Sequence, residues 1–184
     1  RCASEYMMGM AEKSAKEKAD LLLKELGLRP EDRPVVPAAR EAALVAESRA
    51  RDDDDAIYCG AALELPSGEL VTGKNSTLLH AATAAVLNGI KRLAGVPDQI
   101  HLLSPLVIES VARLKRDVLG RKSASLDVDE ALIALSISAA LTPMVQACVD
   151  RLHCLRGCQM HMSHVPSPGD EAGLRKLGVN LTSD

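Results

Sequence analysis

The sequence predicts an α/β protein in which an amino-terminal helical segment precedes a three-layer α-β-α domain with a mixed sheet. Two patterns predict this class. Residues 3–26 repeat Ala and Leu at spacings of three and four, which is typical of an amphipathic helix. From residue 56, short apolar runs alternate with longer helical patterns, as in a sheet between helical layers. The core must be aliphatic, because the 184 residues include no Phe or Trp.

The helical segment is expected to hold two helices, over residues 3–26 and 37–49. Gly27 is a suitable C-cap for the first of them, and Pro30 forbids its continuation. The acidic run Asp52–Asp55 then predicts a solvated linker. The expected organisation is therefore a helical segment (1–51), an acidic linker (52–55) and an α/β domain (56–184). Because the chain starts at Arg1 inside a helical pattern, we expect it to be a fragment or a processed chain.

The α/β domain is expected to open with a hairpin and to end on a strand. Pro66-Ser67-Gly68 is the hairpin turn, and Asp127 with Glu130 has the spacing of a capping box. The first two strands pair antiparallel through this turn, so the sheet should be mixed. The expected strands are 56–65, 69–72, 99–103, 158–165 and 179–182, and the expected helices are 77–94, 105–119, 127–138, 143–155 and 170–177.

Composition excludes several classes of function. Lys and Arg number 22 against 25 Asp and Glu, and aromatic stacking platforms are absent, which argues against nucleic-acid binding. No apolar run reaches the roughly 18 residues of a membrane span, so no membrane partner is expected. The five Cys are an odd number in a long chain, which is not a disulfide framework. Free thiols of this kind suit a cytoplasmic location.

The first candidate site lies between the hairpin and the helix that follows it. Lys74, Asn75 and Ser76 precede a helix N-terminus, where backbone amides and a cation could bind an anion. His80 lies in the first turn of that helix, and Ser104 ends the strand expected beside it. The alternative is an ordinary turn in which a hydroxyl caps the helix. A Walker loop is excluded, because the first spaced glycine is missing.

A zinc deaminase carries its metal ligand and its acid at this point of a strand–helix unit, as H-x-E, and two more ligands as P-C-x-x-C. The first motif here reads His80-Ala81-Ala82, and the second junction reads 105-PLVI-108. One imidazole does not make a zinc site. We therefore expect neither a metal nor another cofactor.

The second candidate site is the loop that leads into the last helix. His161 and His164 precede Asp170, and a His with a nearby carboxylate can do acid–base work. Asp170 could instead simply cap its helix. Cys154 and Cys158 extend these residues to a metal-like pattern, but in a strand His161 points to the opposite face from Cys158 and His164. Packing in the core therefore explains this cluster better than a metal does.

Four stretches, 71–76, 100–105, 129–138 and 175–182, resemble the carboxy-terminal part of a family of uncharacterised bacterial proteins that carry a domain of unknown function. The resemblance covers nearly the whole chain and is clearest over residues 56–184. It implies a helical domain followed by a three-layer domain of cytidine-deaminase-like topology without the zinc motif. It also implies a longer protein with a large amino-terminal domain. It supplies no function and no functional residues.

Two functions remain open at this stage, and the sequence does not decide whether the chain is an enzyme. The first is a non-catalytic domain that packs on its own amino-terminal domain or forms a homo-oligomer, and that binds a small ligand. The second is a nucleotide- or phosphate-binding enzyme domain, similar to a transferase, which uses the Lys74 loop and His80. Its partner would be a small phosphorylated ligand.

Overall fold

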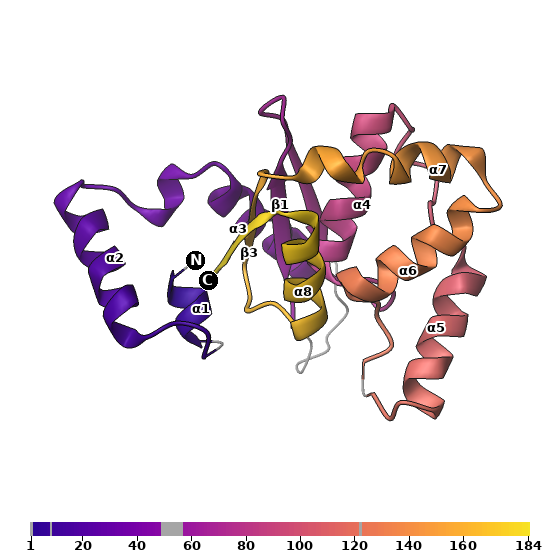
Figure 1. Ribbon diagram of the computed structural model, residues 1–184, viewed down its shortest axis with the longest axis horizontal. Helices are drawn as coiled ribbons and strands as arrows, with labels where there is room; N and C mark the ends of the chain where they lie inside the picture. Colours follow the sequence, from indigo (N-terminus) through magenta and orange to yellow (C-terminus); the bar gives the residue numbers. More distant parts are fainter. Residues whose placement is uncertain (1, 8, 49–56, 122) are drawn as a thin grey trace.

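In the computed structural model, a four-stranded sheet lies at the centre of the chain, with helices on both of its faces (Figure 1). The structure describes residues 2–7, 9–48, 57–121 and 123–184. The spatial order of the strands is β2-β1-β3-β4, where β1 is antiparallel to both β2 and β3, and β3 is parallel to β4. The predicted α/β class with a mixed sheet is therefore confirmed. The strands are β1 (Gly60–Glu64), β2 (Leu70–Lys74), β3 (Gln159–Met162) and β4 (Asn180–Ser183).

Two helices cover opposite faces of the sheet at very short range. Helix α3 (Val35–Ser48) packs on one face, where a Cβ on Gly60 would lie 2.1 Å from the carbonyl oxygen of Ala39. Helix α4 (Ala81–Ala94) packs on the other face, where a Cβ on Gly73 would lie 2.3 Å from the amide nitrogen of Ala85. These two glycines let backbone meet backbone, so the three layers depend on them.

The main core lies between the sheet and α4, and it is aliphatic throughout. Its largest fully buried side chains include Leu63, Ile90, Leu126, Leu135 and Met160. Helix α6 begins with the predicted capping box, in which Asp127 and Glu130 exchange hydrogen bonds. The helices on this side are α5 (Pro105–Asp117), α6 (Val128–Ala139), α7 (Pro143–Val149) and α8 (Pro168–Leu177).

The first expected helix is broken into two. Helix α1 (Cys2–Met7) ends at a turn in which Gly9 takes a φ of +72°, and α2 (Lys13–Glu25) starts afterwards. The amphipathic sequence pattern continues through this turn, so the pattern does not predict the break. A single Gly does not predict it either, because Gly within a helix costs only about 1 kcal/mol. Helix α2 buries none of its residues and lies at the edge of the molecule (Figure 1).

The strand expected over residues 99–103 is wrong. The sheet consists of β1–β4, and residues 99–103 pair with neither of its outer strands, β2 and β4. The segment is an irregular connection in which Leu102 and Leu103 are buried without ladder pairing. The buried ammonium of Lys91 donates to the carbonyl oxygen of Asp98 at 2.9 Å and fixes the preceding turn. An apolar run alone does not separate a strand from such a buried connection.

The remaining differences are at the ends of elements. The helix expected over 143–155 stops at Val149, and two short 3-10 helices occupy Leu152–Leu155 and Pro30–Asp32. The acidic run 52–55 lies outside the described residues, so the proposed domain boundaries stay predictions. Helix α3, which was assigned to the helical segment, packs directly on β1 and thus belongs to the same layered structure.

Candidate functional site

Asp170 is the centre of the candidate site, although its side chain is almost completely removed from water. It is only 1% exposed and lies in the first turn of α8, whose N-cap is Ser167. Its Oδ1 accepts a hydrogen bond from the backbone N–H of Val128 at 3.1 Å, and its Oδ2 accepts one from Ser167 Oγ at 2.7 Å. These contacts place the carboxylate at the N-termini of both α6 and α8, where helix dipoles favour a negative charge.

His80 completes the set of partners of this carboxylate. It is the N-cap residue of α4, and its Nδ1 lies 2.7 Å from Asp170 Oδ2. The hydrogen bond to Asp170 raises the pKa of His80 above its usual value, although partial burial opposes the charged form. With Nδ1 directed at the carboxylate, Nε2 is the nitrogen left for a ligand.

Helix α8 packs so closely on the start of α6 that two positions of α8 have room only for glycine. A Cβ on Gly169 would lie 2.0 Å from Asp127 Oδ2, and a Cβ on Gly173 would lie 2.6 Å from Val128 Cγ1. His80 is held from the other side, because its backbone N–H donates to the carbonyl oxygen of Leu126 at 3.0 Å. The carboxylate and the imidazole are thus brought together by backbone packing between segments that are 90 residues apart.

A cavity of about 350 Å³ opens in front of the His80–Asp170 pair. Asn75 fixes one wall, because its Oδ1 accepts from the N–H of Cys59 at 2.8 Å and its own N–H donates to the carbonyl oxygen of Cys59 at 2.9 Å. Asp170 is the one carboxylate among the described residues of the lining. The polar side chains and the thiol of the lining are those of Cys59, Asn75, Ser76, His80, Ser123, Ser125, His164, Ser167 and Asp170.

The structure joins parts of the two candidate sites that the sequence treats separately. Asn75, Ser76 and His80 from the first candidate face the same cavity as His164 and Asp170 from the second. No pattern along the sequence could show this, because β1, β3, α4 and α8 meet only through sheet topology. The apolar wall of Ile57, Met162, Val165 and Pro166 also escaped prediction.

Lys74 and Ser104 are not brought to this cavity. Lys74 lines a neighbouring groove of about 680 Å³ between α3, β2 and α4, which shares Ser76 with the cavity. Ser104 is the N-cap of α5, and its Oγ accepts from the N–H of Val107 at 3.3 Å. The expected strand that would have carried Ser104 to the site does not form.

His161 lies on the opposite face of the sheet, as its alternation with His164 predicts. It is 3% exposed and pairs in register with Ala62, which contacts α3. Its Nδ1 lies 2.9 Å from Thr182 Oγ1, while Nε2 lies 3.3 Å from Asp184 Oδ1 without a well-directed hydrogen bond. Burial lowers the pKa of His161. Its place on the opposite face of the sheet keeps this residue out of the cavity lining.

Cys59 lines the cavity, which the sequence did not indicate. Burial raises the pKa of its thiol, and its Sγ contacts the carbonyl oxygen of Gly60 at 3.7 Å. A thiol in that state is a poor nucleophile at neutral pH. Cys59 therefore contributes shape to the cavity wall.

The fold and site define the class of this molecule as an α/β domain with an imidazole–carboxylate pair at a cavity. Residues 31–184 match the family described as "Domain of unknown function DUF1846, C-terminal". The chain belongs to this family of uncharacterised bacterial proteins, which confirms the resemblance drawn from the four sequence stretches.

Three relatives show how far the similarity extends. A UPF0371 protein of Clostridium botulinum (strain 657 / Type Ba4) is 40% identical over 184 residues, which is 100% of this chain. UPF0371 proteins of Clostridium tetani (strain Massachusetts / E88) and Clostridioides difficile (strain 630) are each 39% identical, over 98% and 100% of the chain. In each case the chain spans 36% of the length of the relative.

Two further findings concern only the part of the chain that the structure describes. No three side chains of His, Cys, Asp or Glu in these residues converge as a metal site would require. No helix there combines the length and the apolar character needed to cross a membrane.

Proposed function

We propose that the cavity in front of His80 and Asp170 binds a small phosphorylated or otherwise anionic ligand, and that His80 exchanges a proton with it. The observation that carries this proposal is the 2.7 Å contact between His80 Nδ1 and Asp170 Oδ2 at the cavity wall. Asp170 orients the ring and favours its charged form, so Nε2 can donate a hydrogen bond or a proton to an anion.

The surroundings of the pair support an anionic ligand. Helix α4 begins at the cavity, and its N-cap His80 makes no capping hydrogen bond with its side chain. An anion at this helix N-terminus would lie where the helix dipole favours a negative charge. The serine hydroxyls of the lining add donors that suit phosphate oxygens. The volume of about 350 Å³ lies at the lower end of the range for small-molecule sites, which favours a compact ligand.

Deamination is not part of this proposal. The cytidine-deaminase-like topology suggested by the resemblance would place a metal ligand at His80 and the acid two residues later. Ala82 stands at the position of that acid. Lys74, which the sequence offered as the phosphate-binding cation, is also left out, because it lines the neighbouring groove.

The test is a thermal-shift titration with inorganic phosphate and with adenosine monophosphate. At about 100 times Kd, a ligand of the folded state adds roughly 2.7 kcal/mol of stability, which raises Tm by about 5–11 °C. His80→Asn should abolish the rise. His153→Asn should keep it, because His153 is an exposed residue of the 3-10 helix at Leu152–Leu155, and it does not line the cavity. A wild-type protein that responds to neither probe would refute the phosphate class.

A second function is favoured by helix α2, which buries none of its residues. Leu22 and Leu26 are 56% and 68% exposed, and an isolated helix of this length is marginal in water. The family match begins at residue 31, after α2, while the relatives align from the start of the chain and are much longer. In this second proposal α2 packs on the part of the longer family proteins that this chain does not span. Adding that part as a separate protein should slow hydrogen exchange at the amides of α2. Unchanged exchange would contradict it.

A further inference from the structure

The surface of α6 and α7 lacks charge over an unusual length. Residues 131–149 include no Asp, Glu, Lys or Arg, and the two helices are separated by Pro143. Part of this stretch is buried in the core, but four large side chains face outward: Ile133, Ile137, Leu141 and Met144, which are 64%, 55%, 83% and 43% exposed. We call these four residues the α6–α7 face.

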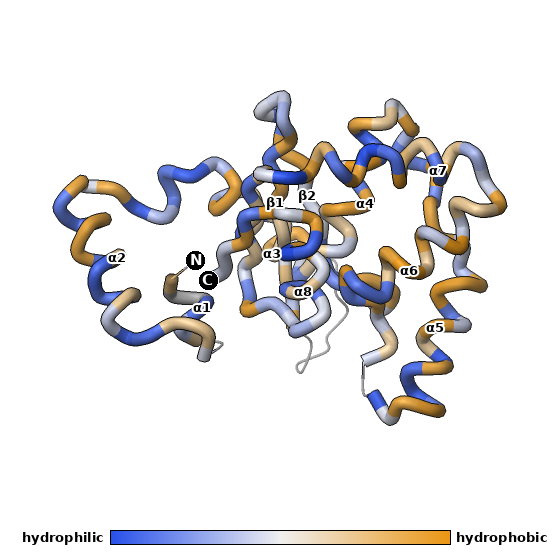
Figure 2. The backbone as a smooth tube through the Cα atoms, viewed as in Figure 1, coloured by the Kyte–Doolittle hydropathy of each residue, from blue (hydrophilic) through white to orange (hydrophobic). Residues whose placement is uncertain are grey.

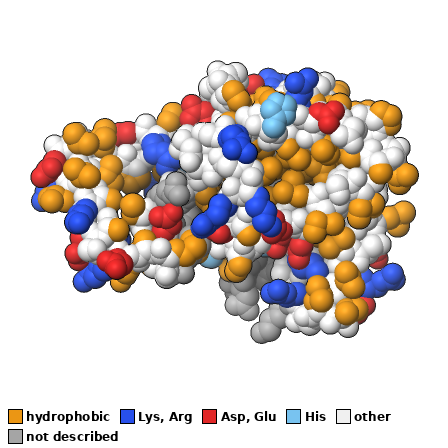
Figure 3. Space-filling view, in the orientation of Figure 1, with side chains coloured by type: hydrophobic (Ala, Val, Ile, Leu, Met, Phe, Trp, Pro, Cys, Tyr) orange, Lys and Arg blue, Asp and Glu red, His pale blue; other side chains and the backbone are white. Residues whose placement is uncertain are grey.

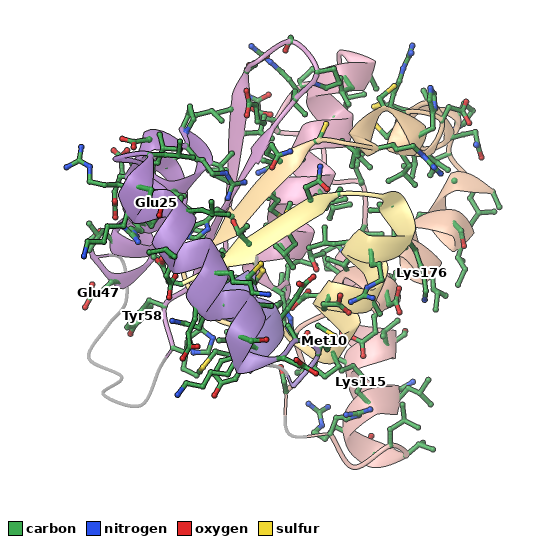
Figure 4. The ribbon with its side chains drawn as sticks, turned by 60° about the vertical axis from the view of Figure 1, so that its left-hand side comes forward. Met10, Glu25, Glu47, Tyr58, Lys115 and Lys176 are labelled. Atoms are coloured by element: carbon green, nitrogen blue, oxygen red, sulfur yellow. The ribbon has the colours of Figure 1, made fainter. Side chains whose placement is uncertain are left out.

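The polar groups beside this face that are described next have ion-pair or hydrogen-bond partners within the chain. The acidic residues of the first turn of α6 are paired, Asp129 with Lys176 of α8 at 3.0 Å and Glu130 with Lys115 of α5 at 2.6 Å (Figure 4 labels both lysines). The hydroxyl of Ser136 donates to the carbonyl oxygen of Ile133 at 2.8 Å. A helix that faces water normally carries a polar side, whereas a helix that is apolar all round is normally buried.

Neighbouring side chains enlarge the apolar surface. Leu106 and Leu114 of α5, with Val118 and Leu119 just after it, are each more than half exposed. Figures 2 and 3 show hydrophobic residues along the outer helices α5, α6 and α7. The eight side chains together expose on the order of 1,000 Å², whereas a stable interface takes about 800 Å² from each partner.

We propose that the α6–α7 face is the centre of an interface with a second copy of this chain. A two-fold axis brings the same patch of both copies together. A charged residue near the axis would therefore lie next to the same charged residue of the other copy and be repelled by it. A patch without charge is free of this repulsion. Ile133 and Ile137 lie one turn apart on α6, Leu141 lies in the connection and Met144 lies on α7, so the face spans both helices.

The test is the mass of the protein in solution, measured by sedimentation equilibrium over a range of concentrations. The wild-type chain of 19.5 kDa should sediment as a dimer. Ile137→Asp should be a monomer with an unchanged circular dichroism spectrum, because residue 137 faces water in the single chain. Met144→Asp on α7 should act in the same way. Leu26→Asp is the matched control, since it places the same charge on the exposed C-cap leucine of α2, and this variant should remain a dimer.

Three results would overturn the proposal. One is a wild-type chain that is monomeric at every concentration, which would assign the face to another part of a family chain. Another is a dimer that Leu26→Asp disrupts and Ile137→Asp does not. The third is a monomer that binds vesicles of phosphatidylcholine and phosphatidylserine and loses this binding in Ile137→Asp.

Discussion

The carboxylate of Asp170 has almost no contact with water, so its charge must be balanced by the groups around it. Hydrogen bonds from the N–H of Val128, from Ser167 Oγ and from His80 Nδ1 supply this balance. The N–H of Val128 belongs to the core, whereas Ser167 and His80 both line the cavity. The same residue therefore joins the N-termini of three helices, α4, α6 and α8.

Removing this carboxylate should destabilise the fold. Asp170→Ala leaves the buried N–H of Val128 without an acceptor, and we expect a loss of about 2–4 kcal/mol in the free energy of unfolding. Asp129→Ala is the matched control, because Asp129 forms a partly exposed pair with Lys176 and should cost no more than about 1 kcal/mol. Urea denaturation measures both values, and equal losses would contradict the central role of Asp170.

The His80–Asp170 pair should also make stability depend on pH. The pKa of His80 is raised in the folded state, so its contribution is fully present below about pH 6.5, the ordinary pKa of His, and is lost as the pH rises through the folded value. The stability difference between wild type and His80→Asn should therefore shrink from pH 6 to pH 8.5. The corresponding difference for His153→Asn should not follow this course. A difference for His80→Asn that grows with pH would contradict the sign.

At the scale of elements, the layers depend on how closely strand and helix approach. Gly73→Ala should cost about 3 kcal/mol or more, because the new Cβ meets the backbone of α4 at 2.3 Å. Gly89→Ala is the control in the partner helix, where the nearest atom is the flexible Leu63 Cδ2 at 2.9 Å and helix propensity improves. We expect Gly89→Ala to change the free energy of unfolding by less than about 1 kcal/mol. Thermal denaturation that ranks the two variants in reverse would contradict this packing.

The elements were predictable where the local chemistry decides them. The capping box at Asp127, the turn at Gly68 and the C-cap at Gly95 each specify a structure within a few residues. The strand expected at 99–103 failed because a short apolar run can be buried equally well in an irregular connection, and only the packing of the whole molecule decides between the two. His80, Asn75 and Asp170 could each be selected from the sequence, but their convergence could not, since it depends on the pairing of β1 with β3.

For the whole molecule, burial predicts a gradient of local stability from α2 to α4. Helix α2 buries no residue, while α4 buries nine of its 14 residues between the sheet and α6. Local opening should therefore be much cheaper in α2, and its amides should exchange with solvent far faster than those of α4. Hydrogen exchange followed by mass spectrometry measures this difference. Equal protection of the two helices in a chain shown to be monomeric would contradict the description of α2 as a helix that buries no residue.

We propose above all that Asp170 raises the pKa of His80 and so favours an imidazolium that an anion can use. The most direct measurement is an NMR titration of the His80 ring, assigned by the loss of its resonance in His80→Asn, with and without inorganic phosphate. The account predicts a pKa above 6.5 in the free protein, and a further increase when phosphate binds, because the anion stabilises the imidazolium. A pKa at or below 6.5 that phosphate leaves unchanged would contradict it.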